Sequence, residues 1–258
     1  MELIKGADTP YEAYENLLLE RDQISREADQ IWIAYLRLFG KLIAELYEEK
    51  LECVKSKKII AYYQRALNHG GDVDAAEMER FLEREMAEYY SHLRRMQKEN
   101  DVAGHAKIVT PYEAERAKKL YRRLAKLLHP DLNPEVDRSD VLKELWQRVM
   151  TAYRHSDVKS LSELEVLARK ALEEAGLSAA RVVIPDLQEK IDEIKREIEA
   201  IRSEEPYTLR FLVEDEEAQE AKRRELTEEL EKYREYRREL NDTILGMLKS
   251  GGLKIHVQ

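Results

Sequence analysis

The sequence predicts an all-α protein, and three observations support this fold class. Charged residues make up 38% of the 258 residues and hydrophobic residues 43%, a balance typical of long helices with one face in water. Only 9 Gly and 6 Pro are present, so few positions interrupt a helix. Apolar residues recur at intervals of three and four over long stretches, which places them on one helical face. We expect a central helical core between an N-terminal helical bundle and a C-terminal helical hairpin.

Two helices are predicted to begin with the same signal. Thr9-Pro10-Tyr11-Glu12 and Thr110-Pro111-Tyr112-Glu113 both have the pattern of a capping box. In a capping box the Thr hydroxyl accepts a hydrogen bond from the third helical amide, and the Glu carboxylate accepts one from the Thr amide. Proline suits the first helical position because its missing amide hydrogen would have no partner there. These two sites therefore mark helix starts.

The N-terminal region, residues 1–104, is predicted to form two or three long helices. Leu and Ile residues after the first capping box keep helical spacing, with a break either near Gly40 or before Lys55. The next apolar stretch ends at Gly70-Gly71, and residues 74–99 have the pattern of another amphipathic helix. Antiparallel packing of such helices would bury their apolar faces.

The central region, residues 105–177, contains the most polarised helix of the chain. From Pro111 to Leu128 the apolar residues form one stripe, and the opposite face is basic. Residues 112–129 contain six basic and two acidic side chains, although the net charge of the whole chain is −9. The basic residues are Arg116, Lys118, Lys119, Arg122, Arg123 and Lys126. Either acidic side chains elsewhere in the fold balance this face, or it docks on an acidic partner.

The basic helix is predicted to stop at His129-Pro130-Asp131. Proline disfavours the helical conformation at the residue before it and has no amide hydrogen to donate, so Pro130 ends the helix. A second proline, Pro134, stiffens the turn. We expect His129 and Asp131 to lie in an exposed turn, where the Asp131 carboxylate is available to pair with a cation on a partner.

The segments on either side of this turn carry the signature of a known family. Tyr121-Arg122-Arg123-Leu124-Ala125, followed after three residues by His129-Pro130-Asp131, matches one helix and loop of that signature. Trp146, Val149, Ala152 and Tyr153 match the aromatic and aliphatic positions of the next helix. Together they resemble helix II, the loop and helix III of a J-domain, the Hsp70-stimulating module of DnaJ-type co-chaperones. The resemblance covers residues 110–156.

The resemblance implies a partner and a set of contact residues. In J-domains the basic face of helix II docks on an acidic surface of a DnaK-type Hsp70, and the loop aspartate engages an arginine at the junction of the nucleotide-binding domain and the linker. These contacts raise ATP hydrolysis by Hsp70. The Hsp70-binding residues implied here are Lys118, Lys119, Arg122, Arg123, Lys126, His129, Pro130 and Asp131. His129 and Pro130 would fix the loop, and Tyr121 and Leu124 would hold helix II against helix III.

The chain departs from the J-domain pattern outside this segment. No Tyr-x-x-Leu-Gly signature of helix I precedes helix II, and residues 74–99 are the expected replacement. Ser156 stands where the family usually has Leu, and a longer helix ending at Gly176 follows in place of a basic helix IV. The chain has neither a Gly/Phe-rich linker nor a Cys-rich zinc module. These departures concern client handling more than the Hsp70 contact.

The C-terminal region, residues 178–258, has a stricter apolar repeat. One seam consists of Ile184, Leu187, Ile191, Ile194, Ile198 and Ile201, spaced by three and four. A second seam runs from Leu226 to Met247, with Arg237 as its polar exception. Pro206 lies between the seams and prevents one continuous helix, so the sequence predicts an antiparallel coiled-coil hairpin. Pairing of the same seams between two chains would instead give a homodimer.

Two details of this hairpin follow from its sequence. Arg237 would be destabilising in a dry core, so we expect it beside an acidic residue such as Glu193 or at a wet edge. At the base of the hairpin, residues 181–184 and 253–257 are rich in β-branched side chains and are expected to pair as strands.

Composition and motifs disfavour several functions. A net charge of −9 and a pI near 5.4 disfavour nucleic-acid binding, which needs a basic surface. The single Cys53 and six scattered His residues lack metal-ligand spacing, and no glycine-rich phosphate loop is present. We therefore expect no metal, no cofactor and no enzymatic activity of the chain itself. With neither a signal peptide nor a membrane-spanning segment, the expected location is cytoplasmic, away from the membrane.

Two functions of different classes remain open from the sequence. The first is a J-domain co-chaperone, in which the flanking helices locate the module or recruit a client protein through the coiled coil. The second is a structural or adaptor coiled-coil protein whose J-like core is uncoupled from Hsp70. A third, RNA or ribosome contact through residues 116–126, is disfavoured by the acidity of the chain.

Overall fold

The fold is known from a computed structural model that describes residues 9–177 and 186–256. These residues are almost entirely helical, so the predicted all-α class is confirmed. Both predicted capping boxes are present, with Glu12 N donating to Thr9 Oγ1 at 3.3 Å and Glu113 N donating to Thr110 Oγ1 at 3.2 Å. Among the described helices, none is long and apolar enough to cross a membrane.

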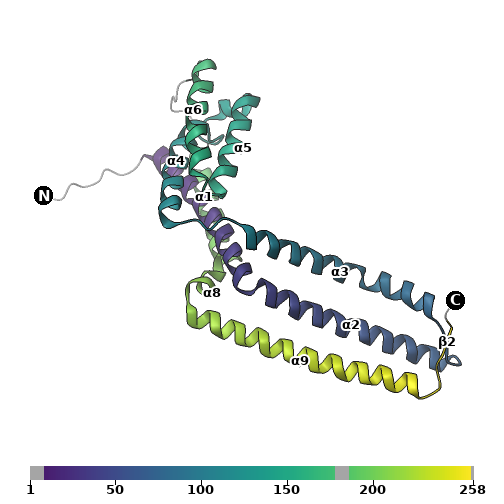
Figure 1. Ribbon diagram of the computed structural model, residues 1–258. Helices are drawn as coiled ribbons and strands as arrows, with labels where there is room; N and C mark the ends of the chain where they lie inside the picture. The colour runs from purple at the N-terminus through teal and green to yellow at the C-terminus, as the bar shows by residue number, and fades with distance from the viewer. Residues whose placement is uncertain (1–8, 178–185, 257–258) are drawn as a thin grey trace. The chain divides into compact units, whose positions relative to one another are not determined.

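The described residues form two compact units, each assembled from separate segments (Figure 1). Unit 1 contains residues 9–32, 107–177 and 186–210, and unit 2 contains residues 33–106 and 211–256. The predicted division into three consecutive regions is therefore wrong. The physical reason is that an apolar helical face packs on whichever face complements it, and this face can belong to a helix far away in the sequence.

The centre of unit 1 is a group of three helices around one apolar core. They are α4 (Pro111–Leu128), α5 (Asp140–Arg154) and α6 (Val158–Glu174), and the short 3₁₀ helix η2 (Pro134–Arg138) follows α4. The aliphatic and aromatic positions matched by the J-domain signature face this core. Its fully buried side chains include Leu124, Leu128, Val136, Leu142, Val149, Tyr153 and Leu161.

A second layer of unit 1 is built from α1 (Pro10–Tyr35) and α7 (Leu187–Ser203), with the 3₁₀ helix η3 (Tyr207–Leu209) after α7. The first predicted seam lies on α7, where Ile191, Ile194 and Ile198 are buried against Tyr14 and Leu18 of α1. Ion pairs flank this contact, with Arg202 Nη2 2.8 Å from Glu20 Oε1. The predicted pairing of this seam with the second seam is thus wrong, because α1 supplies the apolar face that covers it.

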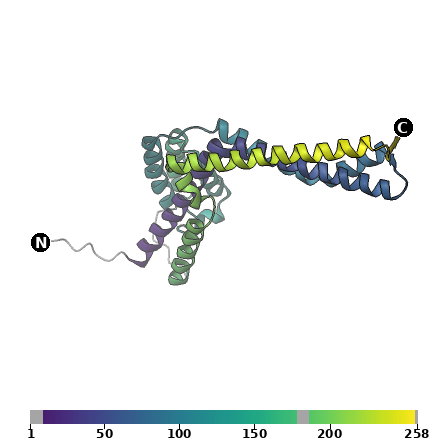
Figure 2. The same ribbon diagram turned by 90° about the horizontal axis from the view of Figure 1, so that it is seen from below.

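Unit 2 is a bundle of three long helices, α2 (Lys41–Asn68), α3 (Ala75–His105) and α9 (Glu216–Lys249). Figure 1 and Figure 2 show α9 lying alongside α2, and the short helix α8 (Arg210–Glu214) precedes α9. The second predicted seam lies on α9 and faces α2, burying Leu226, Leu230 and Leu240. Arg237 lies beside an acidic residue as expected, but this residue is Glu49, at 3.1 Å, and not Glu193.

The predicted break near Gly40 is a local change of helix type. Residues Leu36–Gly40 form a π-helical turn, η1, between α1 and α2, and α2 then continues without a break past Lys55. Asn100 of α3 donates from Nδ2 to the Gly40 carbonyl oxygen at 2.8 Å. A Cβ at Gly40 would lie 2.1 Å from Asn100 Oδ1, so a larger residue there would have to displace the Asn100 side chain. The π turn therefore coincides with a close interhelical contact.

One short parallel strand pair lies at the Gly70-Gly71 end of the bundle. Strands β1 (Asp72–Asp74) and β2 (Lys254–His256) align Val73 with Ile255. The predicted strand near residue 254 is confirmed, but its partner is β1. The other predicted strand, residues 181–184, lies outside the described residues.

We expect Gly71→Ala to open this strand pair. Gly71 has a φ of +84°, and a Cβ there would lie 1.9 Å from the Gly252 carbonyl oxygen. The strain and the clash should increase amide exchange at Lys254, whose N–H donates to the Gly71 carbonyl, by about tenfold or more. Gly70→Ala is the matched control, since its φ is also positive but its Cβ would meet open space. Equal exchange in the two variants would contradict the clash.

Candidate functional site

The basic helix ends at the predicted residue and is followed by a hydrogen-bonded turn. Helix α4 ends at Leu128, and His129 takes an extended conformation with φ −66° and ψ 123°. The His129 amide still donates to Ala125 at 2.8 Å, while its carbonyl oxygen accepts from Leu132 N at 3.0 Å. Pro130 occupies the second position of this turn, where its fixed φ is favourable. The turn after α4 is therefore fixed by backbone hydrogen bonds and by Pro130.

The two polar side chains of this turn differ in exposure. The Asp131 side chain is 44% exposed, as predicted, whereas His129 is 4% exposed, so the prediction of an exposed His129 is wrong. The His129 ring packs edge-on against Trp146 with centroids 4.9 Å apart. Its Nδ1 accepts a hydrogen bond from the Asp131 amide at 3.1 Å. His129 therefore acts inside the protein, and Asp131 faces outward from it.

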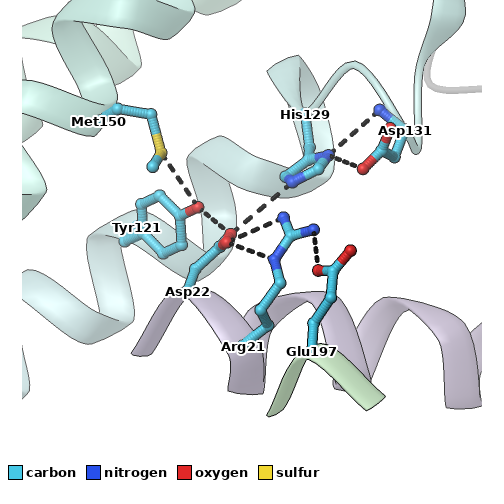
Figure 3. A network of polar contacts seen from close by, with 7 residues as sticks. All are labelled: Arg21, Asp22, Tyr121, His129, Asp131, Met150 and Glu197. Atoms are coloured by element: carbon cyan, nitrogen blue, oxygen red, sulfur yellow. Dashed lines mark hydrogen bonds and ion pairs between the residues drawn. The ribbon is translucent and has the colours of Figure 1, made fainter. Parts of the chain in front are cut away.

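A buried carboxylate from α1 reaches the other side of the His129 ring (Figure 3). Asp22 Oδ2 lies 3.7 Å from His129 Nε2 and accepts a hydrogen bond from Tyr121 Oη at 2.5 Å. Arg21 donates to Asp22 Oδ1 from Nε at 3.1 Å and from Nη2 at 3.0 Å. Arg21 also contacts Glu197 of α7 at 3.3 Å. The network thus joins α1, α4 and α7 to the turn.

Burial and neighbouring charges shift the pKa values of three acidic groups around the turn, Asp22, Tyr121 and Tyr14. Burial raises the pKa of Asp22, but the contacts with His129, Arg21 and Tyr121 together outweigh burial and hold this pKa below its ordinary value. Burial, and then the charge of Asp22, raises the pKa of Tyr121 well above its ordinary value. Burial, and then the charge of Asp131, raises the pKa of Tyr14 to about 12. At neutral pH Asp22 is therefore ionised and Tyr121 keeps its proton.

Tyr121 and Leu124 hold α4 against α5, as predicted. The Tyr121 ring stacks on that of Tyr153 with centroids 3.9 Å apart and an interplanar angle of 6°. Leu124 is fully buried in the same core. The Tyr121 ring also lies 5.8 Å from that of Trp146, so the aromatic positions matched by the family signature form one cluster.

Three cations of the basic helix have acidic partners within the protein. Lys126 Nζ lies 2.6 Å from Glu15 Oε1 of α1, and Arg123 donates two hydrogen bonds to Glu165 of α6 at 2.9 and 2.7 Å. These hydrogen bonds from Arg123 lower the pKa of Glu165 to about 2 despite its partial burial. Lys119 lies 3.6 Å from Glu115 on its own helix. Part of the basic face is therefore balanced internally.

Lys118 and Arg122 differ from these cations. Within the described part of the chain, neither has an acidic side chain at ion-pair distance, and Arg122 is exposed. A sixth cation, Arg116, lies over the Tyr112 ring at 5.7 Å. Internal balance by acidic side chains therefore applies to Lys119, Arg123 and Lys126. The exposed Arg122 and the half-buried Lys118 remain available to an acidic partner.

Helix α1, and not residues 74–99, occupies the place beside the J-like helices. Residues 74–99 lie within unit 2, so that expectation is wrong. Arg26 of α1 is buried, donates to Ser156 Oγ at 2.9 Å and lies over the Tyr153 ring at 4.7 Å. Ser156 has a φ of +51° and is fully buried. The Ser156 hydroxyl thus gives the buried Arg26 guanidinium a hydrogen-bond acceptor, which a Leu side chain at this position would not provide.

Sequence reasoning missed Asp22 and Arg26. Both follow Leu18 at intervals of four, so they lie on the buried stripe of α1 although they carry charge. A charged residue on an apolar stripe indicates a buried polar contact, and this signal could have identified both.

Comparison of the chain with protein-family models, with curated proteins and with solved structures gave no match in any of the three. Among the described residues, no three His, Cys, Asp or Glu side chains are grouped closely enough to hold a metal ion. The turn and the helix before it combine two features. An outward carboxylate is held by a buried histidine, and exposed cations lie on the preceding helix.

Proposed function

We propose that this protein is a J-domain-type co-chaperone that binds a DnaK-type Hsp70 and stimulates its ATP hydrolysis. The observation that carries the proposal is the turn itself. The Asp131 carboxylate is partly exposed, while the turn that presents it is fixed by the buried His129 ring and by Pro130. A fixed, solvent-facing carboxylate is suited to a charge-assisted hydrogen bond with an arginine of a partner.

The charges of α4 support a division of roles within this proposal. Arg122 and Lys118 have no internal acidic partner among the described residues, so their charge is available to an acidic Hsp70 surface. Such charges raise association rates and set orientation more than they add affinity. Asp131 then supplies the contact at the junction of the nucleotide-binding domain and the linker. Unit 2 would locate the module or recruit a client.

Single-turnover ATP hydrolysis tests the proposal. An Hsp70 from the same source is preloaded with ATP, and its hydrolysis rate is measured with increasing amounts of the full chain. We expect a saturable acceleration. A DnaJ-type protein that stimulates the same Hsp70 serves as the positive control. No acceleration by the chain, where the positive control is active, would favour the adaptor function.

We expect Arg122→Glu to weaken Hsp70 binding in a salt-dependent way. The substitution replaces attraction by repulsion at an exposed position, which should weaken binding by about 3- to 10-fold at low salt. The difference should shrink as salt rises, because screening acts over about 8–10 Å at physiological ionic strength. Affinity is measured by titration at several salt concentrations.

Lys98→Glu is the matched control for this measurement. It makes the same charge change at an exposed position of α3, in unit 2, and should leave the affinity nearly unchanged. Lys126→Glu is less informative, since it also removes the ion pair with Glu15. An Arg122→Glu variant that binds like the unsubstituted chain at low salt would contradict electrostatic docking through this face.

A further inference from the structure

We propose that Asp22 is a positioning residue, which acts through the tautomer of His129 to set the direction of Asp131. The expected effect on Hsp70 stimulation rests on the proposed function, whereas the effect of Asp22 on the His129 tautomer does not. Asp22 belongs to α1, outside residues 110–156 that resemble a J-domain. The structure therefore assigns a role at the turn to a residue that the resemblance does not supply.

The hydrogen bond inside the turn requires one tautomer of His129. A neutral imidazole carries its proton on one nitrogen and accepts on the other. The Asp131 amide donates to Nδ1 at 3.1 Å, so Nδ1 must be the acceptor and Nε2 must carry the hydrogen. That hydrogen faces Asp22 Oδ2, which lies 3.7 Å from Nε2. A carboxylate at this nitrogen favours the Nε2–H tautomer, because it stabilises a nearby N–H dipole.

Two carboxylates compete for the ring, and burial decides between them. Asp131 Oδ2 lies 3.8 Å from Nδ1 and by itself would favour the opposite tautomer. Its side chain is 44% exposed, so water screens it, whereas the Asp22 side chain is 6% exposed. Charges in a low-dielectric site interact more strongly than charges in water at the same distance. The Nε2–H tautomer that Asp22 favours should therefore predominate over the Nδ1–H tautomer that Asp131 favours.

Other side chains keep Asp22 charged and in place. Tyr121 donates to Oδ2, and Arg21 donates twice to Oδ1, so both oxygens of the buried carboxylate have donors. Arg21 is itself held by Glu197 of α7. Figure 3 shows this arrangement, in which the Asp22 carboxylate lies between the donors and the His129 ring. A carboxylate fixed in this way can orient a histidine without moving.

Asp22→Asn is the informative substitution because it keeps the shape and changes the hydrogen-bond pattern. The Asn carbonyl is expected to face Arg21, since two guanidinium N–H groups point there. The amide NH₂ then replaces Oδ2 beside His129 and donates towards Nε2. The proton would move to Nδ1, where it meets the N–H of Asp131. Two donors cannot bond to each other, so the turn should lose this hydrogen bond.

The experiment measures the His129 tautomer and the ATPase stimulation in the same full-length proteins. Long-range ¹⁵N–¹H NMR of the histidine rings is recorded from about pH 5 to about pH 9, which brackets the ordinary imidazole titration. The His129 signals are assigned with His129→Gln. We expect Nε2–H in the unsubstituted chain, Nδ1–H in Asp22→Asn, and an at least roughly tenfold loss of stimulation in that variant. Tyr121→Phe keeps the Asp22 carboxylate and should keep the Nε2–H tautomer.

Each outcome decides between the parts of the proposal. An Nδ1–H tautomer in the unsubstituted chain overturns it without any Hsp70 measurement, even if Asp22→Asn does not fold. A switched tautomer with full stimulation also overturns it, as does an unchanged tautomer in Asp22→Asn. A switched tautomer in a chain that never stimulates Hsp70 supports the role of Asp22 in positioning the turn and overturns only the proposed function.

Discussion

Asp131→Asn should reduce the stimulation of Hsp70 ATP hydrolysis by about 30-fold or more and leave the fold intact. Removing one partner of a desolvated charge pair at an interface costs about 2–5 kcal/mol, because the other charge is left without compensation. The fold should persist because the carboxylate is 44% exposed, and the backbone amide, not the side chain, bonds to His129. Single-turnover hydrolysis and circular dichroism measure the two quantities.

The matched control for this prediction is Asp137→Asn. Asp137 is exposed on η2, a few residues beyond the turn, and its substitution makes the same change in charge. It should stimulate like the unsubstituted chain. Equal stimulation by Asp131→Asn and Asp137→Asn would exclude the carboxylate of the turn as the contact. His129→Gln is the weaker test, since its ring is buried against Trp146 and its loss should also lower stability.

Tyr121→Ala should lower the free energy of unfolding of unit 1 by about 3–5 kcal/mol, the range for large buried aromatic side chains. The substitution removes the stacked contact with Tyr153 and leaves Asp22 without one of its donors. Tyr121→Phe keeps the ring and loses only the hydroxyl, so about 1.5–3 kcal/mol is expected for the hydrogen bond to a charged group. The loss of stability in Tyr121→Phe measures the polar contact, and the additional loss in Tyr121→Ala measures the packing of the ring.

Urea unfolding followed by Trp146 fluorescence measures this loss. Trp146 lies beside Tyr121, and a Trp32→Phe background leaves it as the single tryptophan. Tyr112→Ala is the control on the same helix, because Tyr112 is 69% exposed and should change stability by no more than about 0.5 kcal/mol. A Tyr121→Ala variant as stable as Tyr112→Ala would show that the aromatic cluster does not hold α4 in place.

Local signals in the sequence predicted where helices begin and end. The Thr110 capping box, the stop before Pro130 and the stop at Gly70-Gly71 were all predicted correctly. Each depends on the conformational limits of one or two residues and on hydrogen bonds within a few positions, so no distant part of the chain changes it. The all-α class follows from many such signals together with helical periodicity.

The position of the turn was also predictable from the sequence, but the environment of its side chains was not. Pro130 alone fixes the place where α4 ends. Whether His129 is exposed depends on Trp146 and Asp22, which come from different helices far apart in the sequence. In the same way, Lys126 and Arg122 look alike in the sequence, and only Lys126 has an acidic partner, supplied by α1.

By itself, the sequence determined that two apolar seams exist and must be buried; the tertiary structure decided what buries them. The α7 seam packs on Tyr14 and Leu18 of α1, and the α9 seam packs on α2. A repeat of Ile and Leu specifies an apolar stripe that is stabilised by burial. The hydrophobic effect that drives this burial is not directional, so it does not select the surface that covers the stripe. The partner is chosen by the shape and charge of every available face, including the ion pairs at its edges. That choice is made only when the whole chain is folded.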